Sequence, residues 1–175
     1  MKDIILTGPK HSGKTSAGKA LAALSGFEFI DLDELILQKT GKTPRQLYSE
    51  SPVVFQKAEV DVIRTIPDNK DSSKQRRVIA AGGGIIDNPE ATAILKNLDA
   101  TIVFLNIYAD TAWKRITNSA DGHLPPGLGI NNPQEVHRDM HEQRTAAYQQ
   151  FADIVIFVEG KTPEEIAAEV LELLQ

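Results

Sequence analysis

The sequence contains no cysteine among its 175 residues, so disulfide bonds, thiolate metal sites and cysteine nucleophiles are all excluded. It also lacks an excess of positive charge, because 24 acidic and 19 basic side chains give a formal net charge of −5. A chain without a basic surplus has few cations to displace the counterions of a phosphate backbone. We therefore expect no general binding to nucleic acid.

Long apolar runs are missing as well. No stretch approaches the roughly 18 apolar residues that a membrane-spanning helix requires, and the first residues show no signal-peptide pattern. The composition, with 41% hydrophobic and 25% charged residues, is ordinary for a globular protein. We expect a single domain over residues 1–175 that is cytoplasmic and monomeric, with a small-molecule substrate and no membrane partner.

The sequence does contain a phosphate-binding motif near its start. Gly8, Gly13, Lys14 and Thr15 occupy every fixed position of the pattern G-x-x-x-x-G-K-[ST]. The motif follows the apolar residues 4–6 and precedes an alanine-rich segment that favours a helix. In this context the loop presents backbone N–H groups and a helix N-terminus to phosphate oxygens. The alternative is a glycine turn that caps a helix and binds nothing, but the strand–loop–helix context favours a nucleoside-triphosphate site.

Each residue type in this loop suits a different part of a nucleotide. The two glycines let the backbone approach phosphate oxygens, the lysine reaches the β- and γ-phosphates, and the threonine hydroxyl is a ligand for Mg²⁺. A later arginine could stack on the adenine ring, although an exposed helix face explains it equally well. The predicted nucleotide-binding residues are Gly8, Lys10, His11, Ser12, Gly13, Lys14, Thr15, Ser16 and Arg115.

Strand-like and helix-like segments alternate along the chain. The predicted strands are residues 2–7, 28–31, 77–81, 100–107 and 153–158. The predicted helices are residues 14–25, 34–39, a helix opening at 43, then 51–66, 88–97, 110–118, 133–151 and 162–174. Apolar strands separated by helices predict an α/β fold, a three-layer sandwich with a five-stranded parallel sheet covered on both faces. Two insertions, residues 33–66 and 119–132, are predicted to form a substrate-binding flap and a lid.

Two carboxylates follow the second predicted strand. Ligands of parallel sheets bind outside the carboxyl ends of the strands, so Asp31 and Asp33 should share a rim with the phosphate-binding loop. Residues two apart in a strand share one face, where a first carboxylate can hold Mg²⁺ and a second can accept hydrogen bonds from a polyol. The alternative is that Asp33 caps the helix that follows.

Gly82, Gly83 and Gly84 follow the third predicted strand on the same rim. Three consecutive glycines are entropically costly, which indicates that a ligand approaches the backbone there. Arg144, on the long predicted helix 133–151, could bind a carboxylate or phosphate with its fork of donors, or lie exposed on the helix surface. His137 and His141 are one helical turn apart but lack a carboxylate partner pattern, so we expect no metal site at them.

Taken together, these motifs resemble those of the shikimate kinases over nearly the whole chain. The resemblance includes the phosphate-binding loop, an Asp-x-Asp after the second strand, a Phe-x-x-x-Glu helix from Phe55, the glycine triplet and an Arg-x-x-x-Tyr helix from Arg144. It implies the fold of nucleoside monophosphate kinases, with a sheet of order 2-3-1-4-5. It also implies ATP-dependent phosphorylation of the 3-hydroxyl of shikimate, a step of aromatic amino acid biosynthesis.

Roles for individual residues follow from the resemblance. It implies that Lys14 stabilises the transferring phosphoryl group, that Thr15 holds Mg²⁺ with help from Asp31 through water, and that Asp33 helps to activate the nucleophile. The substrate-binding residues that it implies are Asp33, Gln56, Gly82, Gly83, Gly84 and Arg144.

The chain departs from the family pattern at two positions. The family has an arginine after Phe55, where this chain has Gln56. The family lid carries Arg-Pro-Leu-Leu, and residues 123–126 here read His-Leu-Pro-Pro. Losing charged contacts to the substrate carboxylate leaves two further hypotheses open. One is a kinase of the same fold for another polyol or sugar acid such as gluconate, and the other is a nucleotide-binding protein without kinase activity.

Overall fold

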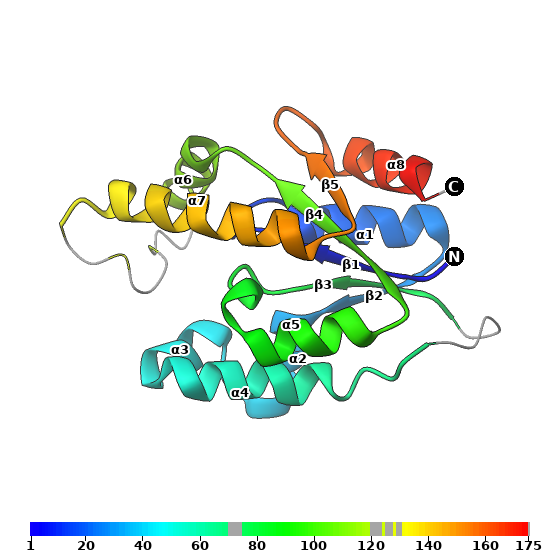
Figure 1. Cartoon of the computed structure of the whole chain (residues 1–175), viewed down its shortest axis with the longest axis horizontal. Helices are drawn as coiled ribbons and strands as arrows, with labels where there is room; N and C mark the ends of the chain where they lie inside the picture. Colours follow the sequence, from blue (N-terminus) through cyan, green and yellow to red (C-terminus); the bar gives the residue numbers. More distant parts are fainter. Residues whose placement is uncertain (70–74, 120–123, 125–127, 129–130, 175) are drawn as a thin grey trace.

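The computed structural model describes residues 1–69, 75–119, 124, 128 and 131–174, in which strands and helices alternate around one sheet (Figure 1). The strands are β1 (Asp3–Thr7), β2 (Glu28–Asp31), β3 (Arg77–Ala80), β4 (Ala100–Asn106) and β5 (Ile154–Phe157). The helices are α1 (Lys14–Ser25), α2 (Leu32–Thr40), α3 (Pro44–Glu50), α4 (Pro52–Ile63), the 3-10 helix η1 (Ile85–Asp87), α5 (Pro89–Asn97), α6 (Ala109–Thr117), α7 (Pro133–Phe151) and α8 (Pro163–Leu173).

The five strands form one parallel sheet of order β2-β3-β1-β4-β5, which confirms the predicted order. Ala80, the last residue of β3, lies opposite Leu6 of β1 and Asp31 of β2. The three strands therefore end at the same level. The loops that follow them must leave from one edge of the sheet.

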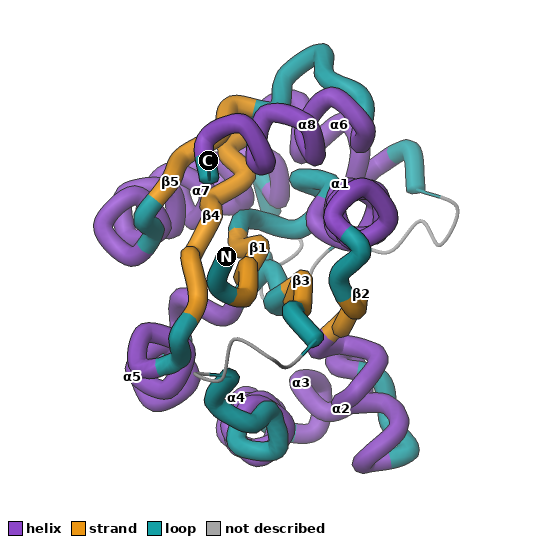
Figure 2. Tube along the Cα trace, turned by 90° about the vertical axis from the view of Figure 1, so that its right-hand side faces the viewer, coloured by secondary structure: helices purple, strands orange, loops and turns teal. Residues whose placement is uncertain are grey.

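Each face of the sheet has its own apolar core. All five residues of β1 are buried, with Ile4 and Leu6 packed against α1 and α8 while Ile5 faces α4 and α5. Neighbouring strand residues point to opposite faces, so the middle residues of a central strand covered on both sides are apolar, as Ile4, Ile5 and Leu6 are. Figure 2 shows α1 and α8 on one side of the sheet and α5 on the other.

Several helices begin at a residue whose side chain caps the helix, at the starts that the sequence predicts. Thr43 and Ser51 accept hydrogen bonds from the backbone N–H groups of Gln46 and Val53, and a proline follows each cap. Thr162 starts α8 in the same way. These side chains satisfy N–H groups that have no partner within the helix.

The start of α2 corrects one expectation. Asp31, not Asp33, caps this helix, because the Asp31 carboxylate accepts the backbone N–H of Asp33 at 2.9 Å. The helix therefore begins at Leu32, and Asp33 lies in its first turn instead of sharing a strand face with Asp31. A second difference is that the helix predicted over residues 51–66 ends at Ile63. A third is the unpredicted 3-10 turn η1 after the glycine triplet.

Residues 33–66, predicted as a substrate-binding insertion, fold mainly as α2, α3 and α4, which group beneath β2 and β3 in Figure 1. In the part of the chain that the structure describes, no helix combines the length and apolar character needed to cross a bilayer. The predicted lid, residues 119–132, falls largely outside the described residues, including His123 and the two prolines that follow Leu124.

Candidate active site

The loop between β1 and α1 has the conformation that phosphate binding requires. Gly8, His11 and Gly13 all have positive φ angles, of 142°, 63° and 94°. A Cβ on Gly8 would lie 2.6 Å from the carbonyl oxygen of Leu105, so no other residue fits there without movement. Gly13 precedes α1 without any side-chain cap, which leaves the first N–H groups of the helix available to an anion.

Lys14 binds its own loop in this structure. Its Nζ donates hydrogen bonds to the carbonyl oxygens of Gly8 at 2.9 Å and Pro9 at 2.8 Å. Burial lowers the pKa of Lys14 to about 8, although the nearby carboxylates of Asp33 and Asp31 act in the opposite direction. The amine is therefore held within the loop and faces two carboxylates on the sheet rim.

Thr15 and Asp31 come together from different elements. The Thr15 hydroxyl donates a hydrogen bond to the Asp31 carboxylate at 2.9 Å, joining the start of α1 to the end of β2. Hydroxyl and carboxylate oxygens are the hard ligands that Mg²⁺ prefers, and phosphate oxygens normally complete its shell. The donor set therefore fits the metal that the sequence predicts at these two residues.

Asp33 lies in the first turn of α2 and points toward the glycine triplet. A Cβ built on Gly82 would be 3.3 Å from Asp33 Oδ1 and 3.3 Å from Glu59 Oε1, so both carboxyl groups converge on this glycine. Desolvation raises the pKa of Asp33, the negative charge of Asp31 raises it further, and Lys14 and Lys10 oppose the rise. A carboxylate with a raised pKa is a better proton acceptor near neutral pH.

Glu59 was not predicted as a site residue. It is only 3% exposed, and its Oε2 accepts a hydrogen bond from Asn88 at 3.0 Å. Burial, together with the charges of Asp33 and Asp87, raises its pKa to about 7, while the Asn88 bond acts against the rise. The available signal was its position four residues after Phe55, on the apolar face of the predicted helix, where a charged side chain is unusual.

Helix α7 is tied to the glycine triplet and to the η1 turn that follows it. The Tyr148 hydroxyl donates to the carbonyl oxygen of Gly83 at 3.2 Å. One turn earlier, Arg144 donates from Nε at 2.9 Å and from Nη2 at 2.5 Å to the same oxygen of Asp87. A Cβ on Gly84 would lie 3.7 Å from Arg144 Nη2, so the guanidinium packs beside bare glycine backbone. Arg144 therefore lies beside the glycine triplet, and its carboxylate partner Asp87 was not predicted.

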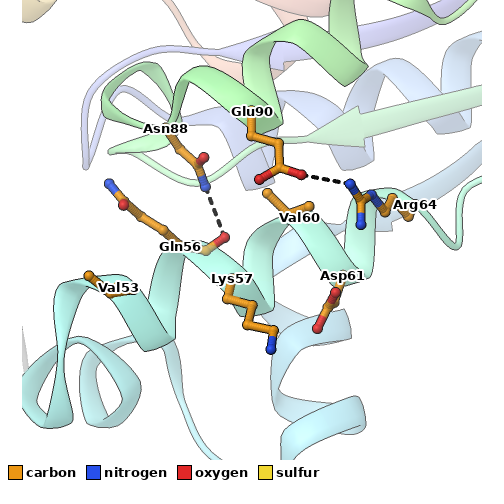
Figure 3. Close-up of a pocket in the computed structure, with 8 residues that line it drawn as sticks. All are labelled: Val53, Gln56, Lys57, Val60, Asp61, Arg64, Asn88 and Glu90. Atoms are coloured by element: carbon orange, nitrogen blue, oxygen red, sulfur yellow. Dashed lines mark hydrogen bonds and ion pairs between the residues drawn. The ribbon is translucent and has the colours of Figure 1, made fainter.

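Gln56 contacts the main chain of Asp87. Its side-chain amide donates to the carbonyl oxygen of Asp87 at 3.1 Å, and its own carbonyl accepts from Asn88 at 2.9 Å. Figure 3 shows the second of these bonds at the edge of a pocket of about 330 Å³ between α4 and α5. That pocket is bordered by the Arg64–Glu90 ion pair and is lined by no residue of the phosphate-binding loop.

The remaining predicted nucleotide-binding residues lie on or beside the loop. Arg115, on α6, donates from Nη1 to the carbonyl oxygen of His11 at 3.0 Å, which places this helix next to the phosphate-binding loop. The Ser12 side chain is fully buried under the loop, whereas Lys10 and Ser16 are exposed to solvent. Among the described residues, no three or more His, Asp or Glu side chains lie together as a possible metal site.

This parallel sheet has a phosphate-binding loop after its central strand β1 and two carboxylates, Asp31 and Asp33, at and just after the end of β2. These features define a P-loop kinase. A sequence model described as shikimate kinase matches residues 10–175. The chain belongs to the shikimate kinase family. It is accordingly an ATP-dependent kinase, as the resemblance in the sequence implies.

Relatives and solved structures agree with this assignment. A shikimate kinase from Thermodesulfovibrio yellowstonii is 34% identical over 98% of this chain and 94% of its own length. One from Caldanaerobacter subterraneus is 33% identical over 98% and 95%. The structure of Acinetobacter baumannii shikimate kinase in complex with shikimate matches with a TM-score of 0.85 and 30% identity, covering 99% of this chain and 93% of that one. The Aquifex aeolicus enzyme matches with a TM-score of 0.74 and 29% identity, covering 98% and 95%.

Proposed function

We propose that this protein transfers the γ-phosphoryl group of ATP to the 3-hydroxyl of shikimate. The observation that carries the proposal is the arrangement at one sheet edge: Asp33 lies near both Lys14 and Gly82, and Arg144 lies beside Gly84 at the other end of the glycine triplet. A donor site, a proton acceptor and a carboxylate-binding group thus lie along the same edge of the sheet. An acceptor with both a hydroxyl and a carboxylate suits it.

In this proposal the residues act mainly by positioning and electrostatic stabilisation. Lys14 leaves the carbonyl oxygens of Gly8 and Pro9 to stabilise charge on the transferring group. Thr15 and Asp31 hold Mg²⁺, which neutralises charge on the phosphates when bound. Asp33 orients the acceptor hydroxyl and accepts its proton, and Arg144 binds the substrate carboxylate.

The proposal includes the two insertions and the state of the protein in the cell. Residues 33–66 serve as the acceptor-binding region and residues 119–132 as the lid that excludes water. Arg45 of α3 donates to the carbonyl oxygen of Leu124 at 3.2 Å, which supports an approach of the two insertions. We propose further that the protein is a monomer, and that it lies in the cytoplasm, where ATP is available as donor.

The test is ADP release with ATP, Mg²⁺ and millimolar shikimate, compared with a control without acceptor. We expect shikimate-dependent turnover and its loss when Mg²⁺ is chelated. Arg144→Ala should raise the KM for shikimate at least about 30-fold, because losing a charged fork costs about 2–5 kcal/mol, with little change in the KM for ATP. Turnover that ignores shikimate would refute the proposal.

A second candidate is phosphorylation of a neutral polyol. Two features favour it. Gln56 stands in place of the family arginine, and the Asp87 carboxylate already accepts hydrogen bonds from two of the Arg144 donor groups. The same assay with gluconate and uncharged polyols separates the candidates. ATP binding without turnover on any acceptor would instead indicate a nucleotide-binding protein.

A further inference from the structure

Arg144, which we expect to bind the substrate carboxylate, already bonds the side-chain carboxylate of Asp87. Both its Nε and Nη2 donate to Asp87 Oδ2, at 2.9 and 2.5 Å. The pair is partly accessible, with about a quarter of the Arg144 side chain and half of the Asp87 side chain exposed. Solvent and ligands can therefore reach it.

Asp87 is fixed by contacts on three sides. Its backbone N–H donates to the carbonyl oxygen of Gly84 at 2.9 Å within η1, and its own carbonyl oxygen accepts the Gln56 amide at 3.1 Å. Its carboxylate bonds Arg144. The side chain that departs from the family pattern, Gln56, thus holds the main chain of the residue that restrains the remaining arginine.

The geometry of the pair leaves part of the guanidinium free. Nε and Nη2 form the side edge of the group, so binding of Asp87 there leaves the end edge, made by Nη1 and the second hydrogen of Nη2, directed elsewhere. Within the part of the chain that the structure describes, Nη1 has no hydrogen-bond partner. Asp87 therefore orients Arg144 without using all its donors.

Although Asp87 orients Arg144 for binding, its negative charge repels an anionic ligand. The acceptor side of the site already holds Asp33 and Glu59, and both Asp33 and Asp87 repel a negative charge on Glu59. The positive charges that oppose these carboxylates are those of Arg144 and Lys14. A substrate carboxylate arriving at Arg144 meets a cation whose charge is already balanced by a carboxylate 2.5 Å away.

We propose that Asp87 is a specificity-determining residue, which orients Arg144 as a hydrogen-bond fork while lowering its preference for acidic over uncharged acceptors. The inference rests on the proposed function for the identity of the acidic acceptor. It assigns two separable properties to one side chain: an acceptor oxygen that positions the arginine and a charge that weakens carboxylate binding.

The two properties are separated by Asp87→Asn and Asp87→Ala. Asparagine keeps an acceptor oxygen and removes the charge, so the KM for shikimate should fall about five- to tenfold, as expected for removal of one partly exposed like charge. The KM for the uncharged methyl ester of shikimate should stay unchanged, and kcat should stay within about twofold. Alanine removes the acceptor too, so its KM for shikimate should exceed that of the asparagine variant.

Asp110→Asn is the matched control. Asp110 also pairs with an arginine of α7, Arg138 at 3.0 Å, but belongs to an exposed pair away from the glycine triplet. It should change neither KM. An unchanged or higher shikimate KM in Asp87→Asn, an equal fall for the methyl ester, or an equal fall in Asp110→Asn would each overturn the inference.

Failure of the proposed function gives a different pattern. If the wild type ignores shikimate while Asp87→Asn phosphorylates it, the proposed function is wrong for the natural chain and the inference stands. If the wild type uses shikimate and Asp87→Asn gains nothing, the proposed function stands and the inference falls. If neither protein uses shikimate, both are overturned.

Discussion

The amine of Lys14 is bound to the loop that it must leave when nucleotide binds. Its Nζ donates hydrogen bonds to the carbonyl oxygens of Gly8 and Pro9, and desolvation lowers its pKa to about 8. The charge that ATP needs is therefore present in the free enzyme only below that pH. Phosphates of bound ATP favour the charged amine and raise its pKa again.

We therefore expect kcat/KM for ATP, which reports the free enzyme, to fall above about pH 8. By contrast, kcat at saturating ATP should stay level to higher pH, because it reports the complex. The measurement is a pair of pH–rate profiles from about pH 6 to 10. Parallel decline of both quantities would show that Lys14 is not the group responsible.

The raised pKa of Glu59 leads to a prediction about the free energy of unfolding. Its folded pKa of about 7 lies above the ordinary value of 4.5, so the folded state holds the proton more tightly than the unfolded state does. The stabilising contribution of neutral Glu59 is complete below pH 4.5 and is lost as the pH rises through 7. Glu59→Gln keeps an acceptor for Asn88 and removes this loss.

The free energy of unfolding of Glu59→Gln minus that of wild type should increase by about 1–3 kcal/mol from pH 5 to pH 8, measured by urea denaturation. The exposed Glu90→Gln is the control and should show no such gain. An equal stability difference from wild type at both pH values would contradict the proposed burial of the charge.

Single residues were predicted where a local pattern identified them and missed where a distant partner was needed. Lys14 and Thr15 belong to one short motif, so spacing alone was sufficient. Asp87 matters because of Arg144, which lies 57 positions further along the chain, and no local pattern connects the two. Glu59 did carry a local signal, as an acid on an apolar helix face, but its polar partner Asn88 becomes visible only in the fold.

At the scale of elements, the phosphate-binding loop and the glycine triplet pack backbone against backbone. A Cβ on Gly83 would lie 2.8 Å from the backbone nitrogen of Lys10 and 3.1 Å from its Cα. The triplet is thus needed partly for contact between two loops, in addition to any contact with substrate. The Tyr148 hydroxyl, on the carbonyl oxygen of Gly83, fixes α7 to the same place.

Gly83→Ala should displace the phosphate-binding loop, lowering the free energy of unfolding by about 1–3 kcal/mol and raising the KM for ATP. Thermal unfolding and ATP kinetics measure the two effects. Gly84→Ala is the matched comparison, because its Cβ would lie no closer than 3.7 Å to another side chain, and its stability should change by less than about 1 kcal/mol. Equal destabilisation of the two variants would argue against the clash with Lys10.

The boundaries of elements were less predictable than their existence. Every predicted strand is present, yet α2 begins at Leu32 because Asp31 leaves the strand in an extended conformation and caps the helix itself. Two aspartates two residues apart can each serve as a cap, so the sequence does not distinguish them. The 3-10 turn η1 depends on the backbone bond from Asp87 to the carbonyl oxygen of Gly84, which no side-chain pattern announces.

At the scale of the whole molecule, a buried ion pair joins the ends of the strands opposite the active site. Arg77 of β3 donates from Nε to Asp3 of β1 at 2.9 Å, and its Nη2 also reaches the carbonyl oxygen of Pro67 at 2.7 Å. Asn69 donates to the same aspartate at 3.2 Å. Both charged side chains are almost fully buried.

Asp3→Ala would leave the Arg77 charge buried without its partner, which costs about 3–5 kcal/mol of unfolding free energy. Urea denaturation should show this loss, whereas the KM for ATP of the folded variant should not change. The double variant Asp3→Ala with Arg77→Met should lose less than Asp3→Ala alone, because no unpaired charge remains. A double variant less stable than the single one would contradict this account.

The order of the sheet illustrates what the sequence supports at this scale. Alternating strands and helices predicted a parallel sheet, but not which strands are neighbours. The order 2-3-1-4-5 came from the resemblance to shikimate kinases, and the structure confirms it. The pair of Asp3 and Arg77 was not predicted, since 74 residues separate the two side chains.

The central place of β1 also has a consequence during synthesis on the ribosome. Its sheet partners lie far along the chain, with Ile4 opposite Val78 on one side and Thr101 on the other. This strand therefore emerges before both of its neighbours, so its apolar residues stay without their native cover until β4 has been made. We expect nascent chains that end before β4 to be the species most prone to aggregate or to engage chaperones.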